Sequence, residues 1–203
     1  MAKKVSKKKP TVGIEDILFM TDRLQTTLGT GVDVFSRTIY LTGEITDELA
    51  QQFIQKLTIL DTLPGVITIR VNSVGGEMSS GMAMYDTMRM TKNEIIVDVV
   101  GAAFSAAVMI LQAGDLRRMS NKASLMLHEG QLFLSETSTF HKVDLTQQAE
   151  SLHEQNELYV EIVAERSKLT QEQVREICKK DTYFNAKQAI KAGLVDEVLD
   201  YRT

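Results

Sequence analysis

The sequence predicts an α/β domain in which a sheet of mostly parallel strands packs against helices. Short runs of β-branched residues alternate with longer segments whose apolar side chains recur at helical spacing. Turn residues such as Pro64-Gly65 and Gly114-Asp115 separate these segments. No self-similarity at a period of about 20 to 50 residues is visible, which argues against a solenoid. We therefore expect one sheet with a helix layer on each face.

The composition is typical of a single globular domain without a membrane span. The chain has 203 residues, 43% of them hydrophobic and 25% charged, and a net charge of −4, so nothing electrostatic favours nucleic acid as a partner. No apolar run approaches the roughly 18 to 20 residues of a membrane helix, and no signal-peptide core follows the basic start. The single Cys178 excludes an internal disulfide and a CxxC zinc site. These features predict a cytoplasmic protein that uses no metal.

The N-terminal 31 residues precede the predicted domain. Residues 1–12 contain five lysines and are expected to form a disordered basic arm. Residues 13–31 are expected to be a helix and linker, in which Ile14 to Leu28 is amphipathic and Gly29-Thr30-Gly31 ends the helix.

The first half of the body reads as alternating strands and helices. Thr46 is a suitable N-cap, since Asp47 and Glu48 follow it in the first turn and apolar residues then recur at helical spacing. The expected elements are a strand at 32–42, a helix to Leu63, a strand at 66–71, a helix at 79–92 and a strand at 94–100.

The second half begins with a small apolar stretch from Val100 to Gly114. We expect it to form a buried helix from Ala102 onward, with Ser105 in its first turn. The elements expected after it are a strand at 123–128, a polar β-leaning segment at 130–141, helices at 144–168, 170–180 and 185–191, and a strand at 195–199. The helix at 144–168 is long and its apolar stripe is narrow, so we expect it to project and pack against another subunit.

Ser105 is the most informative single residue. A helix N-terminus entered from a strand offers free backbone N–H groups and the positive end of the helix dipole, which suit a nucleophile whose attack creates an oxyanion. The alternative is a small residue that lets a core helix pack closely, and this stretch alone favours that alternative.

Three further sites fall at strand ends or in loops, where α/β folds place their ligands. Gly75-Gly76 ends a strand, His128 ends another and Asp181 lies between elements. A serine hydrolase needs an imidazole to accept the hydroxyl proton, a carboxylate to fix the tautomer of the imidazole, and two N–H donors for the oxyanion. Spacing leaves other candidates open, namely His141 and His153 as bases and Asp115 and Asp144 as orienting carboxylates. The absence of GxSxG argues against an α/β-hydrolase.

Several motifs in order resemble the ClpP family of serine peptidases over about residues 32–200. They are Asn72-Ser-Val-Gly-Gly76, Gly81-Met-Ala-Met-Tyr-Asp-Thr-Met88, Gly101-Ala-Ala-Phe-Ser105, Leu125-Met-Leu-His128, Asp181-Thr-Tyr-Phe-Asn-Ala186 and Ala192-Gly-Leu-Val-Asp196. The resemblance implies the ClpP/crotonase fold of repeated ββα units, with residues 32–203 as the peptidase domain and a projecting helical handle at about 130–168.

The resemblance also implies roles for individual residues. The catalytic serine, histidine and aspartate of the family match Ser105, His128 and Asp181, and its oxyanion donors match the N–H groups of Gly76 and Ala106. The substrate-binding positions are expected at Gly75, Gly130 and Gln131. The implied activity is that of a serine endopeptidase that needs no cofactor and acts on unfolded polypeptides. It would work inside a chamber of two stacked heptameric rings, a tetradecamer, served by an AAA+ unfoldase.

The departures from the family pattern concern the partner more than the chemistry. Thr68 and Arg70 stand where the family places aromatic residues of the pocket that receives the docking loops of the ATPase, and Met90 also replaces an aromatic residue. An apolar anchor beside Arg70 would have to desolvate a charge, so we expect altered or absent docking. Phe104 replaces a small residue beside the nucleophile and is expected to narrow the adjacent pocket.

Two alternatives to an active peptidase remain at this point. One is a catalytically silent ring subunit with a structural or regulatory role, and the other is a crotonase-type acyl-CoA enzyme. Intact Ser105, His128 and Asp181 argue against both, because neither uses such a triad.

Overall fold

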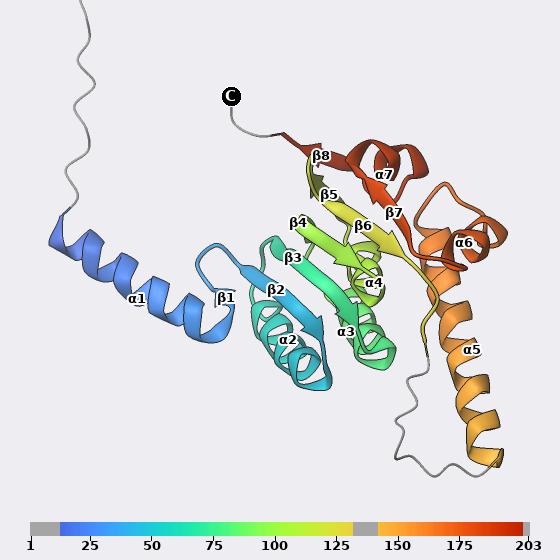
Figure 1. The fold of residues 1–203 in the computed structure, drawn as a ribbon. Helices are drawn as coiled ribbons and strands as arrows, with labels where there is room; N and C mark the ends of the chain where they lie inside the picture. The colour runs from blue at the N-terminus through green and yellow to red at the C-terminus, as the bar shows by residue number, and fades with distance from the viewer. Residues whose placement is uncertain (1–12, 132–141, 201–203) are drawn as a thin grey trace, which may run out of the picture.

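The computed structural model describes residues 13–131 and 142–200, and Figure 1 shows their arrangement. The prediction of a disordered arm at 1–12 and most of the β-leaning segment at 130–141 fall outside the described residues.

A mostly parallel sheet forms the centre of the domain, as the sequence predicts, and it has eight strands in the described part of the chain. Its main path runs through β1 (Val32–Asp33), β2 (Thr38–Ile45), β3 (Ile67–Gly76), β4 (Ile95–Phe104), β5 (Leu116–Ser120) and β8 (Glu197–Leu199). The pairs along this path are parallel except for β1 with β2.

The sheet branches at β4, and this branch creates the edge at which the candidate site lies. The first part of β4 pairs with β5, whereas its last residues, 102–104, pair with β6 (Ser124–Leu127). The short strand β7 (Thr182–Asn185) then pairs with β6 in antiparallel orientation. Neither β5 nor β7 is among the predicted strands, because β5 carries two arginines and β7 has only four residues.

Seven helices are present in the described residues. They are α1 (Ile14–Thr30), α2 (Asp47–Leu60), α3 (Met78–Met90), α4 (Ala106–Ala113), α5 (Lys142–Glu165), α6 (Gln171–Cys178) and α7 (Ala186–Ala192). The predicted caps are confirmed, since the side chains of Thr46, Thr170 and Asn185 each accept a backbone N–H from the first turn.

The helices α2, α3 and α4 lie together behind the sheet, and no described helix covers the front of β2 and β3 (Figure 1). The prediction of a helix layer on each face is therefore wrong for this part of the sheet. The cause is visible in β3, where buried and more accessible residues alternate, so that Arg70 and Asn72 face outward.

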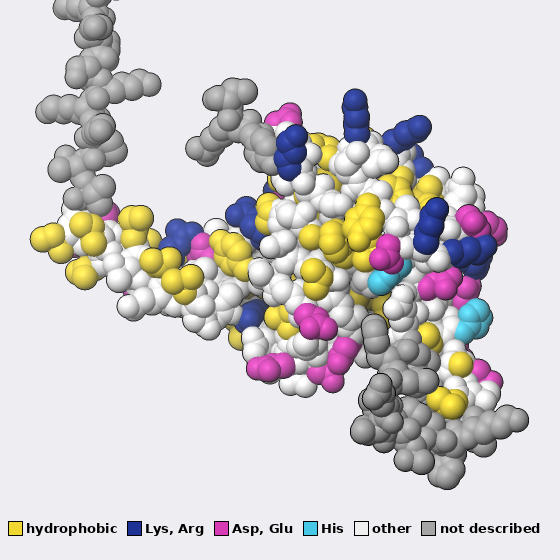
Figure 2. Space-filling view, viewed as in Figure 1, with side chains coloured by type: hydrophobic (Ala, Val, Ile, Leu, Met, Phe, Trp, Pro, Cys, Tyr) yellow, Lys and Arg dark blue, Asp and Glu magenta, His cyan; other side chains and the backbone are white. Residues whose placement is uncertain are grey.

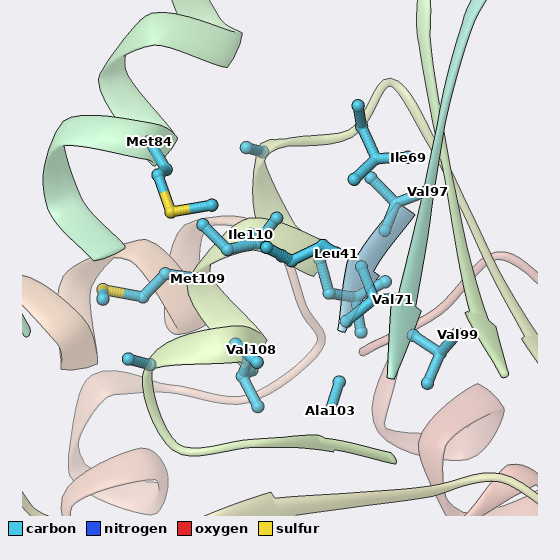
Figure 3. Packing of buried hydrophobic residues seen from close by; sticks show 14 of the residues in the cluster. Leu41, Ile69, Val71, Met84, Val97, Val99, Ala103, Val108, Met109 and Ile110 are labelled. Carbon is cyan, nitrogen blue, oxygen red and sulfur yellow. The ribbon is translucent and has the colours of Figure 1, made fainter. Parts of the chain in front are cut away.

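The core is built around α4, whose eight residues are all buried. Figure 3 shows Val108, Met109 and Ile110 of α4 between Met84 of α3 and the strands. Helix α3 packs closely on α4 at Gly81, where a Cβ would lie 2.7 Å from Met109 Cε, the end of a flexible side chain, and 3.3 Å from Ala106 Cβ. A rigidly packed α4 fixes the position of the residue that precedes it, Ser105.

Two helices extend from this body. None of the residues of α1 is buried, and it is joined to the loop after β1 by an edge-on contact of Phe19 with Phe35 at 4.9 Å and by hydrogen bonds from Arg23 to Asp33. The early described part of α5 is exposed, while Tyr159 to Val163 near its end pack on the body. No described helix is long and apolar enough to span a bilayer.

Candidate active site

The strand pairing brings Ser105 and His128 to the same edge of the sheet. Ser105 directly follows β4 and His128 directly follows β6, and these two strands run parallel with Phe104 opposite Met126. The Ser105 N–H donates to the Met126 carbonyl at 2.8 Å, which ties the two strand ends together. Parallel neighbours end at the same edge, so both side chains emerge there.

The antiparallel strand β7 brings Asp181 to the same place. Thr182, its first residue, lies opposite Leu127, so the residues just outside this pair, His128 and Asp181, are adjacent. His128 Nδ1 and Asp181 Oδ1 are 3.1 Å apart. A carboxylate at that distance favours the tautomer with hydrogen on Nδ1, which leaves Nε2 as a proton acceptor. The His128 side chain is 23% exposed, whereas that of Asp181 is 58% exposed.

Ser105 has an unusual backbone conformation, with φ 52° and ψ −124°. A positive φ is rare outside glycine and stores strain, and a serine at a sharp strand-to-helix turn projects its hydroxyl away from both elements. The structure corrects the predicted start of the helix. Residues 102–104 belong to β4, because they pair with β6, and Ser105 is the N-cap of α4 rather than part of its first turn.

Gly75 lies directly against this turn. A Cβ at Gly75, where φ is +88°, would be 2.5 Å from the Phe104 carbonyl oxygen, 2.8 Å from Ser105 Cβ and 3.1 Å from the Ala106 nitrogen. Only glycine fits without displacing the serine, and its absent side chain opens the approach to the serine hydroxyl.

The two predicted oxyanion donors flank this point. Gly76 ends β3 with φ +151°, and the N–H of the next residue, Glu77, donates to the Ile45 carbonyl at 2.9 Å. Ala106 is the first residue of α4, so its N–H has no acceptor within the helix. Both donors belong to backbone next to the serine turn, where an oxyanion stabiliser has to lie.

Ser105 and His128 line one cavity of about 490 Å³. The predicted substrate-binding residues Gly75, Gly130 and Gln131 line it too. Among the described residues no hydrogen bond joins Ser105 Oγ to His128, and such contacts often close only when substrate binds.

The other candidates do not meet at this cavity. Asp115 accepts the Ile95 N–H at 2.8 Å, at the opposite end of β4, and His153 is exposed on α5. His141 and the side chain of Asp144 lie outside the described residues. Phe104 is not among the described residues that line this cavity, and its narrowing of a pocket beside the nucleophile stays a prediction. The Phe104 ring contacts Tyr183 edge-on at 5.6 Å.

Sequence reasoning missed the residues that hold the loop after His128. The Gly130 N–H donates to Asn156 Oδ1 of α5 at 2.8 Å, and the Glu129 N–H donates to the Cys178 carbonyl at 3.0 Å. Both acceptors are far along the chain, and no local pattern marks them. It also missed Glu44 and Glu77, which line the cavity.

Thr68, Arg70 and Met90 are the positions at which the sequence predicts altered contact with an ATPase. The first two lie on the open side of β3, away from the cavity. Arg70 approaches Asp98 at 3.6 Å and stacks over the Tyr40 ring at 6.0 Å, while Thr68 is half-buried. The Asp98 side chain is only 4% exposed and also receives Arg118 at 2.7 Å. The third position, Met90 at the end of α3, is 75% exposed.

No group of three or more His, Cys, Asp or Glu residues that could hold a metal occurs in the described ranges.

Comparison with known proteins agrees with the fold just described. The model of the Clp protease family matches residues 31–202. The chain is similar to ATP-dependent Clp protease proteolytic subunit 3 of Rhodococcus jostii, with 33% identity over 80% of this chain and 81% of the relative. It is also similar to ATP-dependent Clp protease proteolytic subunits of Lactococcus lactis (28% identity, 83% of this chain and 88% of the relative) and Deinococcus radiodurans (30%, 83% and 85%). This chain belongs to the Clp protease family.

Proposed function

We propose that the protein is a serine endopeptidase that cleaves unfolded proteins or peptides inside an oligomeric chamber. The observation that carries the proposal is the 3.1 Å contact of His128 Nδ1 with Asp181, combined with His128 and Ser105 on the wall of one cavity. Membership of a protease family supports peptide bond hydrolysis in general, and this arrangement supports the serine mechanism.

The chemistry starts at the Ser105 hydroxyl. His128 Nε2 takes the Oγ proton as Oγ forms a bond to the carbonyl carbon of the substrate, and the negative charge moves to the carbonyl oxygen. The N–H groups of Gly76 and Ala106 stabilise this oxyanion. His128 then gives the proton to the leaving amine, which breaks the peptide bond and leaves an ester on Ser105.

The second half of the reaction returns the enzyme to its starting state. Water attacks the ester while His128 accepts its proton, and the acid product leaves as the proton returns to Ser105 Oγ. Asp181 orients the imidazole through Nδ1 and stabilises the imidazolium in both halves. Its exposed carboxylate, 58% accessible in the single chain, lies at the rim of the site.

The assembly that this proposal includes is a pair of stacked heptameric rings in the cytoplasm. The projecting part of α5 supplies the handle that joins the rings, since its early described residues are exposed in the single chain. A domain of residues 32–203, preceded by the helix and linker at 13–31, is the unit that would repeat. The relatives are named ATP-dependent, and here we propose that docking of an AAA+ unfoldase is altered at Thr68, Arg70 and Met90.

The second candidate is a catalytically silent ring subunit. The observation that favours it is the missing hydrogen bond between Ser105 Oγ and His128 among the described residues, because an unaligned serine is not activated. The two candidates differ in one measurable property, the reactivity of Ser105.

The test is to label the assembled protein with a fluorophosphonate probe and to locate the adduct by mass spectrometry. The active enzyme is expected to carry the adduct on Ser105 and to hydrolyse a short fluorogenic peptide. In the Ser105→Ala variant both signals are lost, and turnover falls by a factor of about 10⁴ or more. An intact oligomer that gives no adduct would rule out the peptidase and favour the silent subunit.

A further inference from the structure

The wall of the candidate cavity carries two carboxylates that the mechanism does not use. Glu44 and Glu77 line it, and no lysine or arginine is among the described residues of its wall. Figure 2 shows acidic side chains gathered at the lower end of the body, near the end of β2 and the start of α2.

Glu44 lies close to the nucleophile across the glycine gap. On neighbouring strands Glu44 is the register partner of Gly75, and a Cβ on Gly75 would be 2.8 Å from Ser105 Cβ. Adjacent strands are about 5 Å apart, so two strand spacings, about 10 Å, separate the backbones of Glu44 and Ser105. A glutamate side chain covers much of that distance, and Gly75 has no side chain to block it.

Glu77 occupies the other side of the oxyanion position, one residue after Gly76. The Ser80 hydroxyl contacts both Glu77 Oε2 at 3.1 Å and Asp47 Oδ1 at 2.6 Å. A hydroxyl has one hydrogen to donate, and the shorter contact identifies Asp47 as its acceptor. Glu77 therefore keeps acceptor capacity for a ligand.

Neither carboxylate is neutralised by the protein. Within the described residues the Glu44 side chain has no hydrogen bond or ion pair, and the Glu77 side chain has no lysine or arginine partner. Two unpaired negative charges in one concave site create a potential that attracts cations and repels anions.

We infer that this cavity selects substrates with a lysine or arginine side chain next to the scissile bond, and that Glu44 and Glu77 are the specificity-determining residues. A basic side chain would give the two carboxylates the N–H donors and the positive charge that no described protein side chain gives them. Its aliphatic stem would lie beside Met78 and Leu152 on the same wall. The inference rests on the proposed function, because it assigns the substrate class of the same site.

The test compares internally quenched peptides that differ at a single residue. One set carries Lys, Gln or Glu before the scissile bond, and a second set carries the same residues after it. In one set or both, kcat/KM is expected to be about tenfold higher for Lys than for Gln, with Glu the poorest, as two carboxylates at contact distance allow. The ratio should shrink when salt is raised from about 0.05 M to about 0.5 M. Equal kcat/KM values across both sets would overturn the inference.

Variants that neutralise or reverse the charge of Glu44 and Glu77 test whether these residues cause the preference for Lys peptides. In Glu44→Gln and Glu77→Gln the Lys-to-Gln ratio is expected to fall, and Glu44→Lys is expected to reverse it in favour of Glu. The matched control is Glu48→Gln, an exposed acidic residue of α2 that does not line the cavity and should keep the ratio. A ratio that survives in the Glu44→Gln, Glu77→Gln double variant would contradict the assignment.

A binding measurement separates this inference from the proposed function. Binding of the same labelled peptides to the Ser105→Ala variant, followed by fluorescence anisotropy, needs no turnover. Tighter binding of Lys peptides with no adduct and no turnover in the native chain would mean that the peptidase proposal fails while the charge selection stands. Turnover and an adduct on Ser105, without any preference for Lys peptides, would mean that the peptidase proposal stands while the charge selection fails.

Discussion

At the scale of single residues, the most restrictive position of the site is Gly75, and Gly75→Ala tests it. The new Cβ would meet Ser105 Cβ and the Phe104 carbonyl while the backbone stays at φ +88°. We expect kcat/KM to fall at least about a hundredfold, because the serine turn and the Ala106 donor both shift. Strain at positive φ should also lower the free energy of unfolding by about 1–2 kcal/mol.

Gly43→Ala is the matched control for this prediction. Gly43 has a similar φ of +92°, but an added Cβ there would have no atom within 4 Å. It should lose comparable stability in a denaturant titration and keep its peptidase turnover. Equal loss of turnover in both variants would show that backbone strain, not the contact with Ser105, explains the effect.

Single residues were predicted from the sequence with uneven success, and the reason is physical. The motifs marked Ser105, His128 and Asp181 because strand ends and fixed spacings are visible in one dimension, and the structure brings these three to one edge. No local pattern marks Asn156, which accepts the Gly130 N–H, because that contact joins residues 26 positions apart.

At the scale of elements, the sequence predicts the helices that begin at an N-cap residue. It does not predict that β4 extends through residues 102–104. Thr46, Thr170 and Asn185 accept hydrogen bonds as their residue types predict. Ala102 and Ala103 favour a helix locally, yet residues 102–104 form strand because β6 pairs with all three and β3 pairs with Ala103 on the other side. Pairing with distant strands outweighs local propensity, and sequence periodicity does not report it.

A prediction at this scale concerns the attachment of α1. The hydrogen bond from Arg23 lowers the pKa of Asp33 to about 2, although burial opposes the shift. A carboxyl whose folded pKa is lowered contributes stability above its ordinary pKa of about 4 and loses it as the pH falls through about 2. We expect the protection factors of the α1 amides, measured by mass spectrometry and corrected for the intrinsic exchange rate at each pH, to fall over this acidic range.

Asp33→Asn should produce the same loss of protection at neutral pH, since it removes the charge that holds Arg23. Asp22→Asn is the control, because Asp22 lies on α1 itself and has no ion pair among the described residues. Exchange in α1 that is unchanged by Asp33→Asn would show that the contact of Phe19 with Phe35 is sufficient for the attachment.

At the scale of the whole molecule, the open face of the sheet is where we propose that docking of an ATPase partner is altered. Arg70, Asp98 and Arg118 form a charged cluster on a surface where an apolar anchor would have to dock. We expect an immobilised Clp ATPase to retain the native assembly weakly. Arg70→Leu should increase retention, because Asp98 keeps its hydrogen-bonded partner Arg118 and one unmatched charge is gone.

Arg175→Leu is the control for that measurement, because Arg175 also pairs with a carboxylate, Glu157, but lies on α6, which packs on α5. It should leave retention unchanged. Retention of the native protein at ordinary affinity would contradict the proposed change in docking.

The exposed side of α1 has a consequence for handling the protein in solution. Ile14, Leu18, Leu24 and Leu28 are each more than half exposed, and Figure 2 shows their apolar surface along the extended helix. Keeping such surface hydrated is unfavourable, and the penalty is relieved only in an encounter with another molecule. The purified protein should therefore self-associate further as its concentration rises. We expect the mass measured by light scattering to increase with concentration, and to fall when residues 1–30 are removed.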